Sequence, residues 1–444
     1  MADAKIKAPR GTFDILGEQA AKRSALEARA RAILEGAGYE RIETPVLEAT
    51  ELFARGVGES TDIVSKEMFT LQDGSGRSLT LRPEGTAPVC RAYVEHGMHK
   101  RRQPVRLWYL SSFFRRERAQ AGRYREFWQV GAEALGSEDP AVDAESITLL
   151  ARLLAELGVA DVRLRLSSLG GANTRGEYRE RLKAHLHAHE ASLSGEVRGR
   201  IEQNPLRAFD SDHEGTRSVM RDAPRLLDQL STQDAEHFAE VRELLDVAGV
   251  AYEVDSTLVR GLDYYTRTVF EFTSDALGAQ SGVGGGGRYD GLVQALGGPP
   301  TPGMGWAAGV ERMMLAGDSQ PVAAPVVQLF LALDEHVRSE GASEAGNGGD
   351  GPPPGGPDGS REAVRRVAFE LLSEARSAGL TAQMELQGRS LKGQLGHADV
   401  LGARYVAIVS EDGEAVLKDM QGGGQERLEA NAVVHAVLRG LHDL

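Results

Sequence analysis

The sequence predicts an α+β fold in two domains: an antiparallel-sheet domain with a helical insertion, then a small α/β domain. Strand-like runs at residues 105–114 and 124–135, joined by a long arginine-rich turn at residues 115–123, have the pattern of an antiparallel hairpin. From about residue 172 to 250 the sequence turns helical and charged, which indicates a module outside the sheet. After residue 326, strand-like and helical runs alternate, as is typical of an α/β domain.

Length and composition are those of a globular enzyme. The chain has 444 residues, of which 41% are hydrophobic and 26% charged, and this length allows two or three domains. No apolar run approaches the roughly 18 residues of a membrane span, and the first residues lack the apolar core of a secretory signal. We therefore expect a cytoplasmic protein without membrane association. A single cysteine, Cys90, excludes an internal disulfide and a cysteine-based zinc cage, so we expect no protein-ligated metal.

The charge distribution is uneven. A net charge of −14 argues against indiscriminate coating of nucleic acid, which depends on neutralising many phosphates. Residues 101–125 nevertheless hold eight arginines against one acid, Glu117, with aromatic residues between them. This basic island is typical of a local nucleic-acid contact, and a solvated charged face is the alternative.

The first hundred residues predict a helix, a short strand and a hairpin. Apolar residues recur at helical spacing over residues 17–37, and a short strand is expected at residues 39–44. Residues 67–71 and 78–82 predict a β-hairpin.

The hairpin ends in Leu-Arg-Pro-Glu-Gly-Thr, directly before a helical run at residues 89–96. Glu84 and Thr86 therefore lie at a helix N-terminus. Glu84 could complement the helix dipole or bind a substrate ammonium group, and the sequence leaves both alternatives open.

Period-two alternation along residues 124–135 places Gln129 and Glu133 on one face of the strand. Gly131 lies between them and would let a ligand approach, which indicates a pocket floor; a solvated sheet face is the alternative. Further on, Asp139 and Pro140 predict the N-terminus of a helix that runs to Leu157.

Residues 258–272 combine an arginine, an aspartate and two adjacent tyrosines with a strand-like run. Arg260 can fork onto a phosphate or a carboxylate, while Tyr264 and Tyr265 offer flat apolar walls with a hydroxyl at the tip. This is the composition of a binding site, and ordinary aromatic packing on a strand is the alternative.

The glycine-rich run at residues 281–292 nominally matches the G-x-G-x-x-G fingerprint of dinucleotide-binding folds. We reject that interpretation because neither a βαβ unit nor an acidic residue about twenty positions later accompanies it. The glycines are expected to let the backbone pack against a ligand. Residues 303–315 are expected to form a helix lying close against a sheet, with Arg312 projecting toward the site.

The last part of the chain, residues 326–444, is expected to form the small α/β domain. A segment at about residues 340–360 is rich in glycine and proline and poor in apolar residues, which predicts a disordered insertion in this domain.

Six segments together resemble the class II histidyl-tRNA synthetases, and the resemblance spans nearly the whole chain. They are Thr44-Pro45, LRPEGT (81–86), FFRRERAQAGRYREFWQVGAEALG (113–136), LVRGLDYY (258–265), GGGGRYDGL (284–292) and GVERMML (309–315). The resemblance implies a class II catalytic domain over residues 1–320 and an anticodon-binding domain over residues 326–444. It also implies a homodimer that joins histidine to tRNA(His) through a histidyl-adenylate, with release of AMP and diphosphate.

The resemblance further implies roles for individual residues on the ATP side. Arg115 and Arg260 would approach the α-phosphate and the substrate carboxylate as the catalytic residues, and Arg312 would pair with the γ-phosphate. Glu117 would contact groups on the adenine side. Mg²⁺ would accompany ATP.

For histidine, the resemblance assigns a second set of side chains. The α-ammonium group would be held by Glu84, Thr86 and Gln129. Glu133 and Tyr265 would bracket the imidazole nitrogens, and Tyr264 and Tyr289 would complete the wall.

Residues in the turn after Arg115 would meet the tRNA acceptor end; these are Arg118, Gln120 and Arg123. The chain has Ala119 and Ala121 where the family often has proline and lysine, which is a departure in this turn.

Two other functions stay open at this stage. One is a regulatory relative that binds histidine without catalysis, although such relatives usually lack the complete Arg260 segment and the anticodon domain. The other is a sensor of uncharged tRNA, which the absence of an attached effector domain disfavours.

Overall fold

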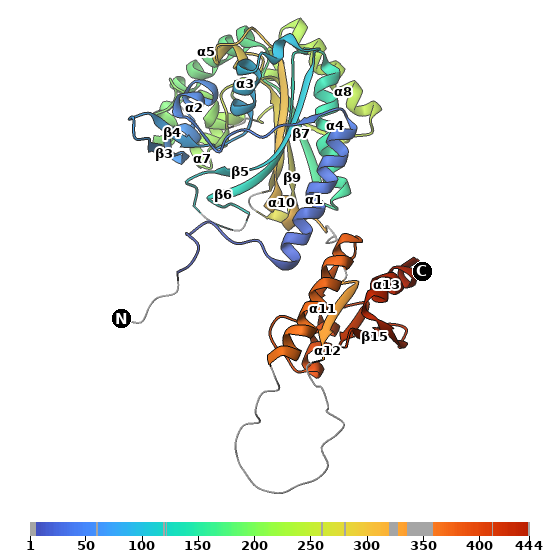
Figure 1. The fold of residues 1–444 in the computed structure, drawn as a ribbon. Helices are drawn as coiled ribbons and strands as arrows, with labels where there is room; N and C mark the ends of the chain where they lie inside the picture. The colour runs from blue at the N-terminus through green and yellow to red at the C-terminus, as the bar shows by residue number, and fades with distance from the viewer. Residues whose placement is uncertain are drawn as a thin grey trace, which may run out of the picture. The chain divides into compact units, whose positions relative to one another are not determined.

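A computed structural model describes residues 6–58, 61–118, 120, 122–258, 261–278, 281–318, 327–334, 358–410 and 412–442. The chain divides into two compact units, Met1–Val322 and Ala323–Leu444 (Figure 1). No helix among the described residues is both long and apolar enough to cross a membrane.

The first unit is built on an eight-stranded sheet, which is antiparallel except at its two edges, where β1 pairs with β5 and β7 with β8 in parallel. The antiparallel-sheet prediction is therefore confirmed. In sheet order, the strands are β1 (Glu40–Arg41), β5 (Val105–Phe114), β6 (Glu126–Leu135), β11 (Gly303–Gly309), β10 (Gly282–Arg288), β9 (Thr266–Ser274), β7 (Val162–Ser168) and β8 (Glu253–Val254).

Strands β5 and β6 form the predicted hairpin, with Phe113 opposite Phe127 and Tyr109 opposite Gly131. The alternation of β6 separates two environments, as predicted. Trp128 packs against the main apolar core, while its neighbour on the strand, Gln129, lines a cavity on the other face.

Helices cover the face of the sheet on which the main apolar core lies (Figure 1). Their apolar stripes meet Trp108, Val130 and Trp306 in the main core. The Asp139 carboxylate caps one of these helices by accepting from the Ala141 amide at 2.8 Å, as expected for an aspartate before a proline. The helices are α1 (Gly17–Gly36), α4 (Pro140–Glu156), α8 (Thr232–Val247) and α10 (Val310–Ala316).

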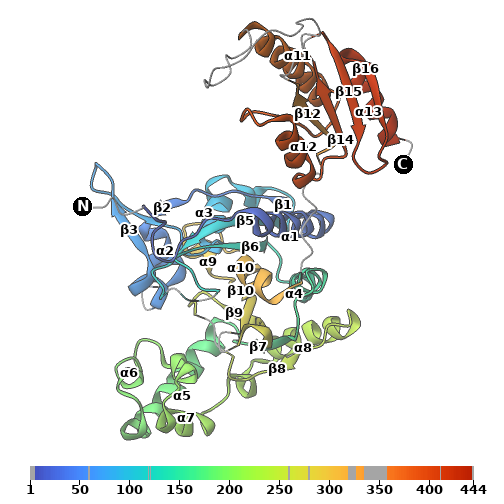
Figure 2. The same ribbon diagram turned by 90° about the horizontal axis from the view of Figure 1, so that it is seen from below.

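A helical insertion follows β7, and its side chains Tyr178, Leu182 and Leu186 belong to an apolar cluster distinct from the main core. Figure 2 shows its helices grouped together beside the β7 side of the sheet. Helix α8 lies within the range expected for this insertion but packs into the main core through Phe238, Val241 and other residues, so the separate helical cluster is narrower than residues 172–250. Its helices are α5 (Ala172–Ala188), α6 (Gly195–Arg198) and α7 (Glu214–Arg221).

A small three-stranded sheet lies beside the main one and contains the hairpin expected near residue 80. It is built from β2 (Leu47–Ala49), β4 (Ser78–Leu81) and β3 (Phe69–Gln72), and the helices next to it are α2 (Thr50–Val57) and α3 (Thr86–Glu95).

The glycine-rich run is strand β10 in the interior of the main sheet, and a short helix, α9 (Leu292–Ala295), follows it. A Cβ atom at Gly286 would lie 1.9 Å from the Gly305 carbonyl oxygen of β11, so close strand pairing requires this glycine. The prediction of a helix over residues 303–315 was wrong for the first half of this range. Gly303–Gly309 forms β11, because its small residues fit against β10, and α10 begins only at Val310.

The second unit has a five-stranded sheet in the order β13-β12-β14-β15-β16, parallel at β13, β12 and β14 and antiparallel beyond. The last two strands were not predicted. Most of the expected insertion at 340–360 lies outside the described residues, and its last three residues belong to α11. The elements are β12 (Leu329–Leu333), α11 (Asp358–Ser377), β13 (Ala382–Met384), α12 (Leu391–Val400), β14 (Tyr405–Val409), β15 (Glu414–Asp419), β16 (Gln425–Glu429) and α13 (Val433–His442).

Candidate active site

A cavity of about 500 Å³ lies on the face of the main sheet that α1, α4 and α8 leave uncovered. Strands β6, β9, β10 and β11 contribute to its lining, together with the start of α3, the turn after β5 and the segment before β9. Segments far apart in the sequence therefore meet here. The cavity has a cationic end and an end rich in hydroxyl and carboxyl groups.

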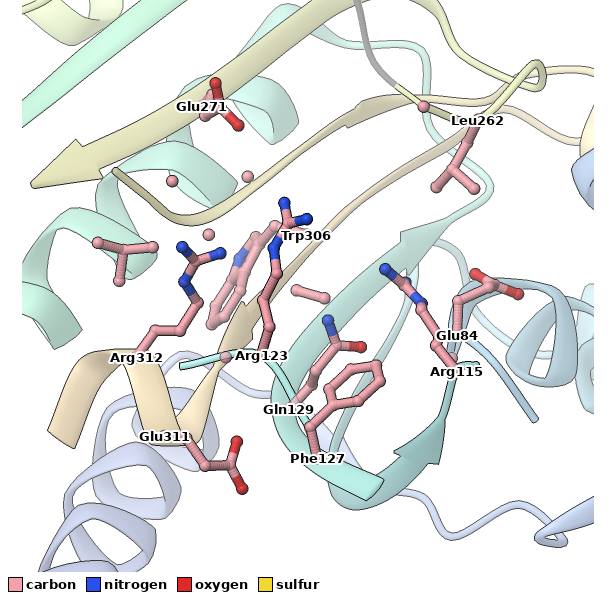
Figure 3. Close-up of a pocket in the computed structure, with 18 of the residues that line it drawn as sticks. Glu84, Arg115, Arg123, Phe127, Gln129, Leu262, Glu271, Trp306, Glu311 and Arg312 are labelled. Atoms are coloured by element: carbon pink, nitrogen blue, oxygen red, sulfur yellow. The ribbon is translucent and has the colours of Figure 1, made fainter. Parts of the chain in front are cut away.

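Arg123 and Arg312 form the cationic end, where their side chains lie side by side (Figure 3). Burial lowers the pKa of Arg312, and the neighbouring Arg123 cation lowers it further. The Glu117 carboxylate lies 3.4 Å from Arg123 and 3.8 Å from Arg115. Two cations that face one cavity favour an anionic ligand between them.

Arg115 follows β5 and lies beside Glu84, away from the Arg123 and Arg312 pair (Figure 3). Its Nε atom donates to the Pro83 carbonyl at 2.9 Å, and its guanidinium carbon lies 5.2 Å from the centre of the Phe127 ring. These contacts hold the guanidinium at the cavity wall, where its Nη1 atom also faces the Glu117 carboxylate.

Glu84 is buried at the N-terminus of α3 and accepts hydrogen bonds from the backbone amides of Thr86 and Ala87, both at 2.9 Å. The helix-capping alternative is thus realised. The same carboxyl lines the cavity and accepts from the Tyr264 hydroxyl at 3.3 Å, so it is also placed to meet a ligand. Burial raises its pKa.

Gln129 projects into the cavity from β6. Its Oε1 atom is buried and has no hydrogen-bond partner among the described residues. A buried carbonyl oxygen without a donor is costly, and a ligand N–H group would satisfy it.

Glu133 lies behind the cavity wall with no exposed surface. Its carboxyl accepts from the hydroxyls of Thr86 at 2.8 Å, Tyr289 at 2.5 Å and Tyr109 at 3.4 Å. Burial raises the pKa of Glu133 to about 8, although these hydroxyls lower it in part. The site therefore holds a carboxyl group that is largely neutral at pH 7.

Two adjacent tyrosines, Tyr264 and Tyr265, form one wall of the cavity, and Tyr289 packs behind them. Tyr264 packs edge-on against Tyr265 and Tyr289, with ring centroids 4.8 and 5.8 Å apart. Tyr264 and Tyr265 line the cavity directly. Their rings supply a flat, largely apolar surface opposite the polar groups of α3 and β6.

The sequence profile of the histidyl-tRNA synthetase family matches residues 11–313. The chain belongs to the histidyl-tRNA synthetase family. A histidine–tRNA ligase from Halorhodospira halophila is 46% identical to it over 99% of both chains. One from Desulforamulus reducens is 42% identical over 96% of this chain and 97% of its own.

Solved structures agree with this membership. An apo histidyl-tRNA synthetase from S. aureus, 32% identical, superposes with a TM-score of 0.76 over 98% of this chain and all of its own. A Bacillus halodurans protein described as an ATP phosphoribosyltransferase regulatory subunit/histidyl-tRNA synthetase shares the fold at 23% identity. Its TM-score is 0.60, over 88% of this chain and 96% of its own.

Most residues singled out from the synthetase motifs converge on the cavity. The lining residues among them are Glu84, Thr86, Arg115, Glu117, Arg123, Gln129, Tyr264, Tyr265 and Arg312.

Other predicted site residues lie elsewhere. Glu133 and Tyr289 are bonded to each other behind the wall. Arg118 lies in a neighbouring basic hollow, and Gln120 pairs with Arg123 through backbone hydrogen bonds of 2.9 and 3.0 Å. Arg260 lies outside the described residues.

Two site residues were missed by the sequence analysis. The Tyr109 hydroxyl donates to Glu133. The Tyr109 ring fills the space beside Gly85 and Gly131. A Cβ atom at either glycine would lie 2.5 Å or less from the Cζ and hydroxyl oxygen atoms of Tyr109. Glu311 accepts from the Trp128 amide at 3.1 Å and so ties α10 to β6. The position of Tyr109 opposite Gly131 in the predicted hairpin could have indicated that Tyr109 belongs to the site.

Proposed function

We propose that this cavity carries out the reaction of the family, the ATP-dependent ligation of L-histidine to tRNA(His). The histidine carboxylate attacks the α-phosphate of ATP, and diphosphate leaves as histidyl-adenylate forms. A hydroxyl of the tRNA terminus then takes the histidyl group, and AMP leaves. Both steps gather negative charge in one place, which fixed cations must stabilise.

Arg312 and Arg123 bind the triphosphate in this proposal, with Mg²⁺ arriving as part of the ATP substrate. Their shared position at one end of the cavity supports this role. Arg123 was expected to meet the tRNA acceptor end; its place in the cavity wall favours ATP instead. Arg115 then contacts the α-phosphate, and the Phe127 ring beneath it offers a flat surface to the adenine.

Histidine occupies the other end. Glu84, Thr86 and Gln129 surround its α-ammonium group, and the unpartnered Oε1 atom of Gln129 supports a donor at this position. The imidazole lies against Tyr264 and Tyr265. The hydroxyl and carboxyl groups at this end can pair with the two imidazole nitrogens. An apolar isostere of histidine would leave these groups unpaired, which gives a discrimination of about 10⁴ to 10⁵ without an editing site.

Glu133 acts on the imidazole from behind the wall in this scheme. Thr86 and Tyr289 donate to its two carboxyl oxygens in the structure, and Thr86 also lines the cavity, so this hydroxyl connects Glu133 to the histidine end. The adjacent Tyr265 side chain lines the cavity and supplies the second polar contact.

One observation carries the proposal: a single cavity joins paired guanidinium groups to a wall of tyrosines and buried carboxyls. The test is ATP–diphosphate exchange with each of the twenty amino acids. Exchange with histidine alone is expected. Exchange with a different amino acid would refute the assignment, whereas histidine binding without exchange would favour the regulatory function.

The remaining parts of the proposal concern partners. Arg118, with Arg10, Arg116 and Arg125, lines a basic hollow next to the cavity, which supports contact with the tRNA acceptor end. The second unit binds the anticodon. The enzyme works in the cytoplasm as a homodimer joined near Thr44 and Pro45, and sedimentation as a monomer at working concentration would contradict this.

A further inference from the structure

The Arg175 side chain of helix α5, in the insertion, contacts the segment that forms the tyrosine wall. The Arg175 Nη1 atom donates to the carbonyl oxygen of Asp263 at 2.8 Å and to that of Tyr265 at 2.7 Å. These two carbonyls flank Tyr264. One nitrogen atom therefore fixes the backbone on both sides of a residue that lines the cavity.

Arg175 lies in the first turn of α5, which is held in place by hydrogen bonds. The buried Asp234 carboxylate of α8 accepts from the Gly171 amide at 2.9 Å and from the Thr174 hydroxyl at 3.0 Å. The Arg267 Nε atom lies 3.3 Å from the same carboxylate. The first turn of α5 is thus tied both to α8 and to the start of β9.

Asp263 is also held from its other side. Its amide donates to the Val57 carbonyl at 3.2 Å, and its carboxylate accepts from the Asn204 amide group at 3.3 Å. A Cβ atom at Gly58 would lie 2.8 Å from that carboxylate, so the packing is close. The segment is clamped between the end of α2 and the insertion.

The tyrosine wall also shares apolar packing with the insertion. Tyr265 belongs to the same buried cluster as Tyr178 and Leu182 of α5. Burial lowers the pKa of Arg175, and its two carbonyl partners offset part of the cost of burying a cation.

We propose that Arg175 is a positioning residue for histidine recognition. By holding the carbonyls of Asp263 and Tyr265, it sets the direction in which Tyr264 and Tyr265 enter the cavity. The helical insertion thereby controls the affinity of the amino-acid end while leaving the ATP end unchanged. This inference rests on the proposed function, in which these tyrosines bind histidine.

Substitution of Arg175 tests the proposal, with Arg179 as a matched control. Arg179 lies one turn further along α5, and its Nη2 atom donates to the Gln203 carbonyl at 2.7 Å within the insertion. In ATP–diphosphate exchange, Arg175→Met is expected to raise the KM for histidine roughly 10- to 100-fold, because misplaced binding groups lose contact with the substrate. The KM for ATP is expected to stay at the wild-type level in Arg175→Met, and both KM values are expected to stay there in Arg179→Met.

Arg175→Lys provides a second variant. A lysine ammonium can donate to more than one acceptor, so a smaller increase in the KM for histidine is expected. If Arg175→Met does not fold, Arg175→Lys carries the test alone. An unchanged KM for histidine in a folded Arg175 variant, or an equal rise in the KM values for histidine and ATP, would overturn the proposal.

Hydrogen exchange separates this inference from the proposed function. Peptides covering residues 261–268 are expected to exchange faster in Arg175→Met than in the wild type or in Arg179→Met. If the wild type shows no histidine-dependent activity, the proposed function fails. Unchanged exchange in this segment of Arg175→Met would instead refute the clamp itself.

Discussion

The Glu133 carboxyl accepts a hydrogen bond of 2.5 Å from the Tyr289 hydroxyl in a site with no exposed surface. Burial is the main reason that the pKa of Glu133 rises to about 8, and the nearby Glu84 carboxyl adds to the rise. A glutamate that stays protonated near neutral pH can donate as well as accept hydrogen bonds. Because Tyr289 also packs against Tyr264, the protonation state of Glu133 is linked to the tyrosine wall.

Glu133→Gln should reduce the pH dependence of stability. The carboxyl titrates near its ordinary value of 4.5 in the unfolded chain and near 8 in the folded one. Between these values only the unfolded chain loses the proton, so the free energy of unfolding falls as pH rises and levels off above about 8. From pH 5 to pH 8 this loss amounts to roughly 3 kcal/mol, and the glutamine variant should lack it.

Urea unfolding followed by tryptophan fluorescence measures this effect in the first unit, because Trp108, Trp128 and Trp306 all lie there. Substitution of the exposed Glu240 by glutamine is the control and should keep the wild-type pH dependence. The same slope in Glu133→Gln and in the wild type would show that Glu133 is already ionised below pH 7.

Gly305→Ala should destabilise the first unit and disturb the tyrosine wall. A Cβ atom at Gly305 would lie 1.8 Å from the Glu133 Oε2 atom, in the interior of the sheet. Overpacking of this kind costs about 1–3 kcal/mol or more. Gly291→Ala is the matched control, since a Cβ atom there meets nothing within 4 Å. Thermal melting should separate the two variants, and equal midpoints would contradict the close contact between β11 and Glu133.

The sequence located the β5–β6 hairpin and the face of β6 that carries Gln129 because both depend on local alternation. It could not place Glu133 behind the wall. That position depends on Thr86 and Tyr289, which come from segments 47 and 156 residues away. The error over Gly303–Gly309 has the same origin: small residues that suit a close helix also suit a strand against β10, and only the tertiary partner decides.

The helical insertion shows a second limit of sequence patterns. Helices α5 and α8 both bury apolar residues at helical spacing, yet α8 packs on α4 in the main core and α5 belongs to a different apolar cluster. Amphipathic spacing tells that a helix has a buried face but not which partner covers it.

Arg312→Ala should weaken ATP use far more than histidine binding. Arg312 lines the cationic end of the cavity beside Arg123, whereas histidine is proposed to occupy the other end. Loss of a guanidinium that stabilises transition-state charge costs roughly 10²- to 10³-fold in rate. Single-turnover adenylate formation and histidine binding by calorimetry separate the two effects. Arg163→Ala, at an exposed ion pair with Asp275, is the control and should retain activity. Equal losses of histidine and ATP affinity in Arg312→Ala would argue for general damage to the site.

Arg260→Ala should abolish adenylate formation while weakening histidine binding much less. Arg260 lies outside the described residues, so its role rests on the motif shared with the synthetase family and on its place in the chain before Gly261 and Leu262, which line the cavity. A fixed guanidinium there would act mainly on the charge that develops as the histidine carboxylate attacks the α-phosphate, and such an interaction affects the chemical step more than ground-state binding. Burst measurements of adenylate, compared with equilibrium binding of histidine, check this separation. Arg260→Lys keeps the charge but not the fork, so it should recover part of the rate. Normal diphosphate exchange in Arg260→Ala would remove this residue from the chemistry and leave Arg115 as the cation nearest the reacting carboxylate.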